Sequence, residues 1–185
     1  MLDEPALGAL LDQAEHELFR LETLDLYEVR TDGSDYDRYL RGEPGPDMAR
    51  KQPWMDRLAE DAARGLRNYR VHLLRSPLSP YLRYECEWGY ALNSTVGEEI
   101  RILDLAEQAE PTAIIDEDFW LMDDATVVRM YYQVGRFIGA EMLPAGDLPR
   151  YRAARDAAWQ EAIPFEQYWS AHREYWRDGA VLGRS

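Results

Sequence analysis

The stretch Arg70-Val-His-Leu-Leu-Arg-Ser-Pro-Leu-Ser-Pro-Tyr-Leu-Arg-Tyr-Glu85 indicates how the rest of the chain is built. Its first part, residues 69–74, alternates apolar and polar side chains, which predicts a half-buried strand. Ser79 followed by Pro80 predicts a helix start, because serine can accept a hydrogen bond from a free helical N–H and proline suits the first turn. The stretch therefore predicts a strand followed by a capped helix.

Further strand signals follow this helix. Residues 99–102 alternate between charged and isoleucine side chains, as a strand does. Residues 119–122 and 126–132 are separated by Asp123-Asp124-Ala125, and aspartate is favoured in tight turns. The sequence therefore predicts a strand, then a β-hairpin, then one more strand at 137–142.

Helical patterns flank this central region. Near the N-terminus, leucines recur every three or four residues, which predicts a helix from Asp3 or Glu4 to about Thr23, followed by a short strand at 24–30. We expect a single domain over residues 1–185. Its parts are a mostly helical region at 1–64 with a loop at 42–53, an α/β core at 65–143 and C-terminal helices at 144–185.

The expected fold class is α+β. Strands outnumber those of a parallel crossover pattern, and short turns join several of them. We therefore expect a mainly antiparallel sheet packed against helices, with helical N- and C-terminal segments.

Composition limits the possible functions. The net charge of -14 argues against a nucleic-acid surface, because phosphate binding needs clustered cations. The lone Cys86 cannot form an intramolecular disulfide, and the N-terminus lacks a signal-like pattern, so we expect a cytoplasmic protein. The sequence has no run of about 18 apolar residues, so no membrane span is expected.

No assembled catalytic motif is visible. The 3 histidines form no metal-binding pair, and the serines lie in no nucleophile elbow. The glycines match no phosphate-binding loop. We therefore predict no catalytic residue, no metal and no cofactor.

One candidate ligand site is an anion pocket at the end of strand 69–75. Strand ends next to helix N-termini often bind ligands, since free N–H groups attract anions. The alternative is a solvated strand face with local ion pairs. The candidate residues are Arg70, His72, Arg75, Arg83 and Glu85.

A second candidate is an aromatic stripe near the C-terminus. Its residues recur on one helical face, and tryptophan often anchors protein interfaces. The alternative is that the stripe closes the core. The stripe consists of Phe165, Trp169, His172 and Trp176.

Several phrases together resemble a family of uncharacterised actinobacterial proteins. Its members are commonly encoded near Xre-type helix-turn-helix regulators, and the resemblance implies a bacterial cytoplasmic protein in a regulatory circuit. It carries no established activity to any residue. The phrases are Phe19-Arg-Leu-Glu22 with Tyr27, Tyr39-Leu-Arg-Gly42, residues 71–85, Gly97-Glu98 and Asp118-Phe-Trp-Leu-Met-Asp123.

Two functions follow as hypotheses. The first is a non-enzymatic binding or regulatory partner, contacting a helix-turn-helix regulator rather than DNA, because an acidic surface suits a basic protein. The second is an enzyme or small-anion receptor that uses the Arg/His-lined pocket. A homodimer joined through helices is compatible with both.

Overall fold

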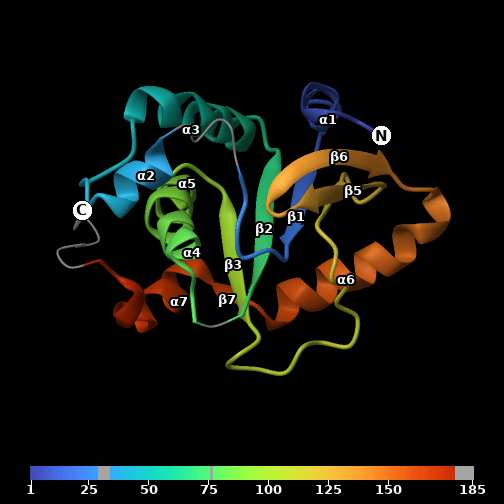
Figure 1. Ribbon diagram of the computed structural model, residues 1–185. Coiled ribbons are helices and arrows are strands. Elements are labelled where there is room, and N and C mark those ends of the chain that lie inside the picture. Colours follow the sequence, from blue (N-terminus) through green and yellow to red (C-terminus); the bar gives the residue numbers. More distant parts are fainter. Residues whose placement is uncertain (29–33, 76, 178–185) are drawn as a thin grey trace.

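The computed structural model describes residues 1–28, 34–75 and 77–177. Within them, seven strands form one sheet in the order β6-β5-β4-β1-β2-β3-β7 (Figure 1). The strands are β1 (Glu17–Glu22), β2 (Arg67–Leu74), β3 (Glu99–Asp104), β4 (Phe119–Met122), β5 (Thr126–Gln133), β6 (Arg136–Met142) and β7 (Ile163–Pro164).

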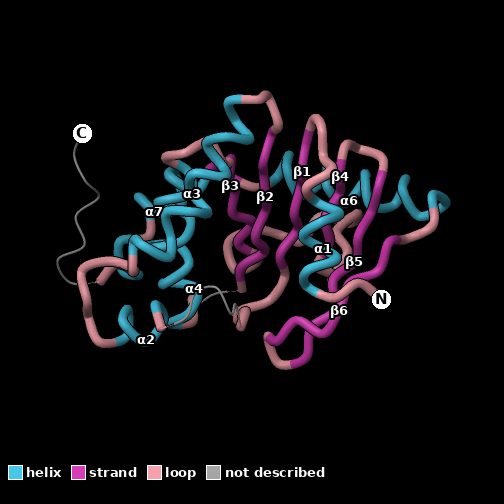
Figure 2. Tube along the Cα trace, turned by 90° about the horizontal axis from the view of Figure 1, so that it is seen from above, coloured by secondary structure: helices cyan, strands magenta, loops and turns pink. Residues whose placement is uncertain are grey.

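Helices cover both faces of this sheet. Figure 2 shows α2, α3, α4 and α7 gathered beside β2 and β3, with α1 near β4, β5 and β6. Helix α6 packs on the opposite face, where its buried side chains join those of β1 and β2. The helices are α1 (Glu4–Leu11), α2 (Asp35–Leu40), α3 (Met48–Ala63), α4 (Pro80–Tyr84), η2 (Glu85–Tyr90, a π-helix), α5 (Ala91–Ser94), η3 (Ala145–Asp147), α6 (Leu148–Glu161), α7 (Phe165–Ala171) and η4 (Arg173–Tyr175).

The α+β fold and the mostly antiparallel sheet are confirmed. Antiparallel pairing joins β1 to β4, β3 to β7, β4 to β5, and β5 to β6. The centre of the sheet differs, because β1, β2 and β3 run parallel and are connected through helices. This parallel centre explains why β2 is buried on both faces.

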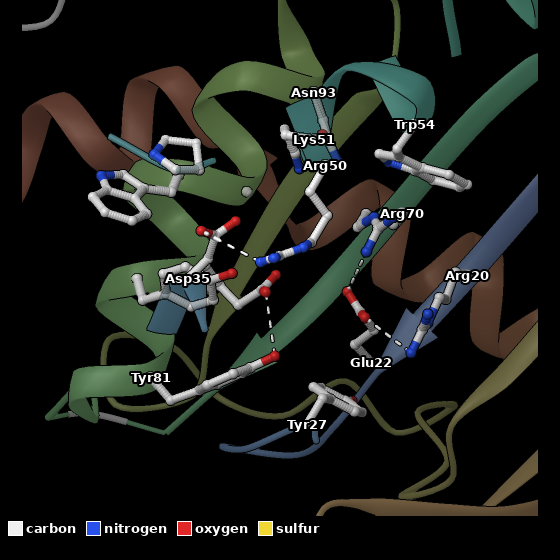
Figure 3. Close-up of a pocket in the computed structure, with 15 residues that line it drawn as sticks. Arg20, Glu22, Tyr27, Asp35, Arg50, Lys51, Trp54, Arg70, Tyr81 and Asn93 are labelled. Carbon is white, nitrogen blue, oxygen red and sulfur yellow. Dashed lines mark hydrogen bonds and ion pairs between the residues drawn. The ribbon is translucent and has the colours of Figure 1, made fainter. Parts of the chain in front are cut away.

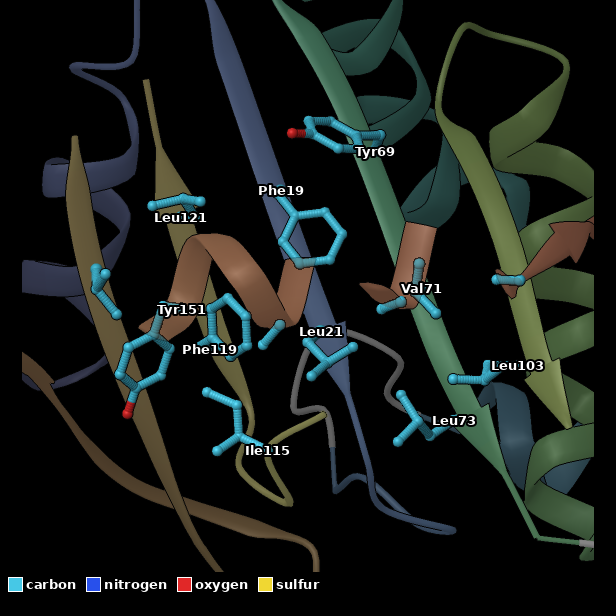
Figure 4. Packing of buried hydrophobic residues seen from close by; sticks show 14 residues of the cluster. Phe19, Leu21, Tyr69, Val71, Leu73, Leu103, Ile115, Phe119, Leu121 and Tyr151 are labelled. Atoms are coloured by element: carbon cyan, nitrogen blue, oxygen red, sulfur yellow. The ribbon is translucent and has the colours of Figure 1, made fainter. Parts of the chain in front are cut away.

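One face of the central strands is the largest apolar core. Side chains from β1, β2, β3 and β4 interlock there with α6 (Figure 4). Phe19 lies 5.0 Å from the ring of Tyr69 and 5.8 Å from that of Phe119. Burial of these side chains supplies the main favourable free energy of folding on this face.

The predicted N-terminal helix to Thr23 is wrong in its second half. Helix α1 ends at Leu11, and residues 17–22 form the central strand β1. Leu18 and Leu21 fit the helical spacing of the earlier leucines, but this segment pairs with a strand on each side. Ladder hydrogen bonds and burial on both faces therefore override the local pattern.

Other local signals match the structure. Ser79 accepts a hydrogen bond from the backbone N–H of Leu82 at 3.1 Å, so it caps α4. Asp123 and Asp124 both adopt positive φ in the β4–β5 turn. Helix α3 begins at Met48, so the expected loop at 42–53 is shorter. The expected strand at 24–30 is wrong over residues 24–28, which form no strand beyond an isolated bridge between Glu28 and Arg136, and residues 29–30 lie outside the described residues.

Candidate functional site

The second face of β1 and β2 carries charged side chains where a core would normally be apolar. The register places Arg20 beside Arg70 and Glu22 beside His72. Because side chains alternate along a strand, these four share the face opposite Phe19 and Leu21. Glu22, Arg70 and His72 are buried, at 4%, 7% and 0% exposure.

Glu22 lies between two guanidinium groups. Its Oε1 is 3.1 Å from Arg20 Nη2, and its Oε2 is 3.0 Å from Arg70 Nη1. The Tyr90 hydroxyl lies 2.9 Å from the same Oε2. Burial alone would raise the pKa of Glu22, but the charges of Arg20 and Arg70 outweigh it and hold this pKa below its usual range.

Arg70 extends the ion pairs toward α5. Its Nε donates to Glu98 Oε1 at 2.7 Å, and its Nη2 contacts the same oxygen. Glu98 Oε2 accepts a hydrogen bond of 2.7 Å from Asn93 Nδ2. Asn93 Oδ1 is buried and has no hydrogen-bond partner among the described residues. An unsatisfied buried acceptor is costly, so this oxygen is a candidate contact for a ligand N–H or O–H.

His72 is fully buried and contacts two oxygens. Its Nε2 lies 2.9 Å from the carbonyl oxygen of Leu24, which can only accept, so Nε2 carries a proton. Its Nδ1 lies 2.6 Å from the Tyr90 hydroxyl. That hydroxyl has one proton, which it donates either to Glu22 or to His72. The position of this proton therefore links the histidine to the ion pairs.

A cavity of about 280 Å³ opens onto this charged face (Figure 3). Its walls come from β1 and β2, from α2 and α3, and from the continuous helix formed by α4, η2 and α5. The lining residues are Arg20, Glu22, Tyr27, Asp35, Pro46, Arg50, Lys51, Trp54, Arg70, Tyr81, Tyr84, Glu85, Trp88, Gly89 and Asn93. We call this space the charged cavity.

The charged cavity gathers basic residues in an acidic protein. Four cationic side chains line it against three carboxylates, while the whole chain has a net charge of -14. The chain has a single lysine, Lys51, and it lies here. Arg50 and Lys51 belong to the first turn of α3, where the helix dipole also favours an anion. The local field therefore suits an anionic group.

The helix beside the cavity is irregular. Residues 85–90 form a π-helix, a widened turn that often occurs at functional sites. Gly89 lies in this turn, and a Cβ there would meet Glu85 Oε2 at 3.1 Å. The absence of a side chain at Gly89 thus leaves room for the Glu85 carboxylate, which lines the cavity together with Trp88.

Aromatic rings form much of the remaining wall. Tyr81 and Tyr84 pack against each other at 5.7 Å, and Tyr84 packs against Trp88 at 6.0 Å. Trp54 remains 38% exposed at the cavity. Tyr81, Tyr84 and Trp88 are buried, so the exposed ring of Trp54 is the one that offers a flat surface to a planar ligand group.

The five predicted pocket residues do not all meet. Arg70 and Glu85 line the charged cavity, and His72 is buried beside it. Arg75 is directed elsewhere, with Nη2 3.4 Å from Asp116 Oδ1. Arg83 lies over the ring of Tyr175 at 5.2 Å. Ligand binding by these residues stays a prediction.

The side chains of the predicted C-terminal stripe mostly contact other parts of the same molecule. Phe165 and Trp169 are 3% and 2% exposed and pack in a core cluster with α4 and β3 residues. His172 Nε2 is 2.8 Å from Glu107 Oε1, and Trp176 Nε1 donates to the Trp169 carbonyl at 2.8 Å. An interface through this stripe stays a prediction, and its first two residues offer little accessible surface.

For several residues of the charged cavity, the sequence pattern gave no indication that they belong to a site. Arg20 and Glu22 alternate within Glu17–Glu22, which is a strand pattern once the segment is not taken as helix. Arg50 and Lys51 resemble solvent-facing helix residues, and Trp54 fits the apolar spacing that Leu58 continues. The chain's single lysine was the one compositional hint.

Within the residues that the structure describes, no group of three or more His, Cys, Asp or Glu side chains could hold a metal ion. No helix in the described ranges has both the length and the apolar composition that a membrane crossing requires.

Comparisons with known proteins identify a family but no activity. The family model described as "Domain of unknown function (DUF6879)" matches residues 5–170. No curated protein matches the chain. The charged cavity lies within the matched range.

Proposed function

The chain belongs to the DUF6879 family, whose description assigns no activity, and we propose that it binds a small organic anion in the charged cavity. The role is that of a receptor. The cavity residues supply charge and hydrogen bonds, and the proposal assigns no residue to catalysis.

The observation that supports this proposal is a buried ion-pair network that opens onto a cavity. Burying charges rarely stabilises a fold, because desolvation offsets the attraction between them. Strongly shifted carboxylates in a cavity are instead typical of functional sites, and the pKa of Glu22 is shifted in this way by Arg20 and Arg70.

Each part of the cavity has a role in this proposal. Arg50 and Lys51 bind the anionic group at the mouth. Trp54 packs against the body of the ligand, and Asn93 Oδ1 accepts a hydrogen bond from a ligand donor. Arg70 and Glu22 hold the floor in a fixed geometry through their contact of 3.0 Å.

Because Lys51 is the chain's single lysine, its reactivity reports on the cavity directly. We would acetylate the protein with a water-soluble activated ester in the presence of inorganic phosphate, citrate or adenosine monophosphate. Peptide mass spectrometry then measures the acetylation rate of Lys51. The N-terminal amine on Met1, which is 82% exposed, is the internal control.

We expect at least one compound to slow Lys51 acetylation about tenfold at concentrations near ten times its Kd. Arg50→Gln should remove this protection. Arg41→Gln should keep it, since Arg41 pairs with Glu43 at 2.9 Å and does not line the cavity. Equal rates at Lys51 with and without all three anions would contradict the proposal.

A second function is favoured by the net charge of -14. We propose that the acidic surface also contacts a basic protein, such as a helix-turn-helix regulator, in the bacterial cytoplasm. Affinity purification of the tagged protein from its host, with light-scattering mass on the eluate, tests this idea. Recovery of a regulator in fixed ratio would support it, and a bare monomer or homodimer would count against it.

A further inference from the structure

A second cavity lies behind the wall of the charged cavity. Its volume is about 400 Å³, and it is formed by the start of α1 together with β5, β6 and the chain around Tyr27. The two cavities share Arg20 and Tyr27. The lining residues are Asp3, Glu4, Pro5, Leu7, Arg20, Tyr27, Glu28, Met130, Tyr132, Arg136, Phe137 and Ile138.

Most of this wall is apolar or aromatic. Tyr132 packs edge-on against Tyr27 at 5.2 Å and against Phe137 at 5.9 Å. Leu7 and Met130 are buried at 7% and 8% exposure in the cluster beneath them. A surface of this kind favours an apolar ligand body.

A guanidinium group lies at the inner end of this apolar wall. Arg20 Nη2 forms an ion pair with Glu22 Oε1 at 3.1 Å. It also donates a hydrogen bond to the Tyr132 hydroxyl at 3.1 Å. Its Nε is buried without a hydrogen-bond partner among the described residues. Buried guanidinium donors usually find acceptors, so Arg20 is one acceptor short.

The remaining charges lie at the rim. Asp3, Glu4, Glu28 and Arg136 are all exposed, and Asp3 already caps α1 by accepting from the Ala6 N–H at 2.9 Å. Exposed charges are screened by salt, whereas the half-buried Arg20 is screened less. The inner charge therefore decides which head group the cavity takes.

We propose that this second cavity binds a small amphiphilic anion, with its apolar body against Leu7, Met130 and Phe137 and its acidic head on Arg20. The second cavity shares Arg20 and Tyr27 with the charged cavity, but its test does not depend on a ligand there.

The test uses the fluorescent amphiphile 8-anilinonaphthalene-1-sulfonate, whose emission rises in an apolar site. We would titrate it against the full chain and against variants of Ile138, which lines the cavity and is 47% exposed. We expect saturable binding. A new charge at the rim should weaken it about threefold in Ile138→Asp and tighten it about threefold in Ile138→Arg.

Met142→Asp is the matched control, because it places the same charge on the same strand at an exposed residue that lines neither cavity. Its Kd for the probe should equal that of the parent chain. Circular dichroism melts confirm that the surface variants fold. The proposal fails if binding does not saturate, if Ile138→Asp and Ile138→Arg do not shift the Kd in opposite directions, or if Met142→Asp weakens binding as much as Ile138→Asp does.

Discussion

The two faces of strands β1 and β2 are built from opposite chemistry. On one face, Phe19, Leu21 and Val71 pack under α6 at 0% exposure. On the other, Arg20, Glu22 and Arg70 form ion pairs under α3, α4 and α5. The same two strands form both faces, and helices cover both of them. The faces differ in the chemistry of their side chains.

The apolar face accounts for stability, because each buried side chain contributes about 1.5–3 kcal/mol relative to exposure. Ion pairs on the charged face gain little net free energy over apolar residues of similar volume. Removing a single partner nevertheless lowers the free energy of unfolding, because it leaves a buried charge unpaired. This difference supports the proposal that the charged face binds a ligand, and substitutions on each face test it.

The largest expected effect comes from Arg70→Met. This change leaves Glu22 and Glu98 buried without their shared cation, so the free energy of unfolding at pH 7 should fall by about 4 kcal/mol. The loss should shrink at pH 5, because burial raises the pKa of Glu22 and the variant removes one of the two arginine charges that hold this pKa down. Urea unfolding at both pH values measures it, and a loss under about 1 kcal/mol at pH 7 would show that Arg70 behaves as a surface residue.

Leu21→Ala on the apolar face should cost about 3 kcal/mol, through lost burial and a residual cavity. Unlike the loss in Arg70→Met, this loss should be the same at pH 7 and pH 5, because no titrating group is involved. The same urea series measures it. A marked pH dependence here would mean that the two faces are not energetically distinct.

Acid unfolding separates two buried carboxylates by the sign of their contribution to stability. The depressed pKa of Glu22, held down against burial by Arg20 and Arg70, contributes stability above the ordinary value of 4.5 that is lost as pH falls through the folded-state pKa. Asp118 has the opposite sign. Burial raises its pKa, so its contribution is present at low pH and is lost as pH rises.

In Glu22→Gln, the part of the pH dependence of unfolding that Glu22 contributes should disappear. Below pH 4.5 the parent chain should take up about one more proton on unfolding than the variant, a difference in slope of about 1.4 kcal/mol per pH unit. Unfolding curves between pH 4.5 and pH 2 measure this slope. Equal slopes would show that Glu22 is not held ionised by its arginines.

The smallest effect on stability is expected at the mouth of the charged cavity. Trp54→Ala should change the free energy of unfolding by no more than about 0.5 kcal/mol, since the ring is 38% exposed. Protection of Lys51 by a bound anion should nevertheless need about tenfold more compound. Acetylation rates and urea melts together measure both quantities, and unchanged protection would remove Trp54 from the site.

Much of the fold was predictable where local chemistry decides it. Ser79-Pro80 and the Asp123-Asp124 turn act through hydrogen bonds and dihedral angles close in sequence. Strand β1 was not predictable in this way. Its segment Glu17–Glu22 carries charges on a buried face, so it lacks the continuous apolar run of a central parallel strand and fits the helical spacing of the leucines before it.

The site was predictable only in part for the same reason. Arg70 and Glu85 were identified from a strand end and the helix that follows it, and both line the cavity. The position of Arg20 at the cavity requires β1 to be a strand. The position of Arg50 is set by which side of α3 faces the sheet. Those relations come from strand order and helix packing, which connect residues far apart in the chain.

The most direct test of the central claim replaces the charged network with apolar residues of similar size. The quadruple variant Arg20→Met, Glu22→Leu, Arg70→Met and Glu98→Leu removes two cations and two anions, so the net charge stays at -14. Its free energy of unfolding at pH 7 is the measurement. We predict a value equal to that of the parent chain or higher by about 1–4 kcal/mol, as for other buried ion pairs. A variant less stable than the parent by more than about 3 kcal/mol would contradict the account, because the network would then be holding the fold together.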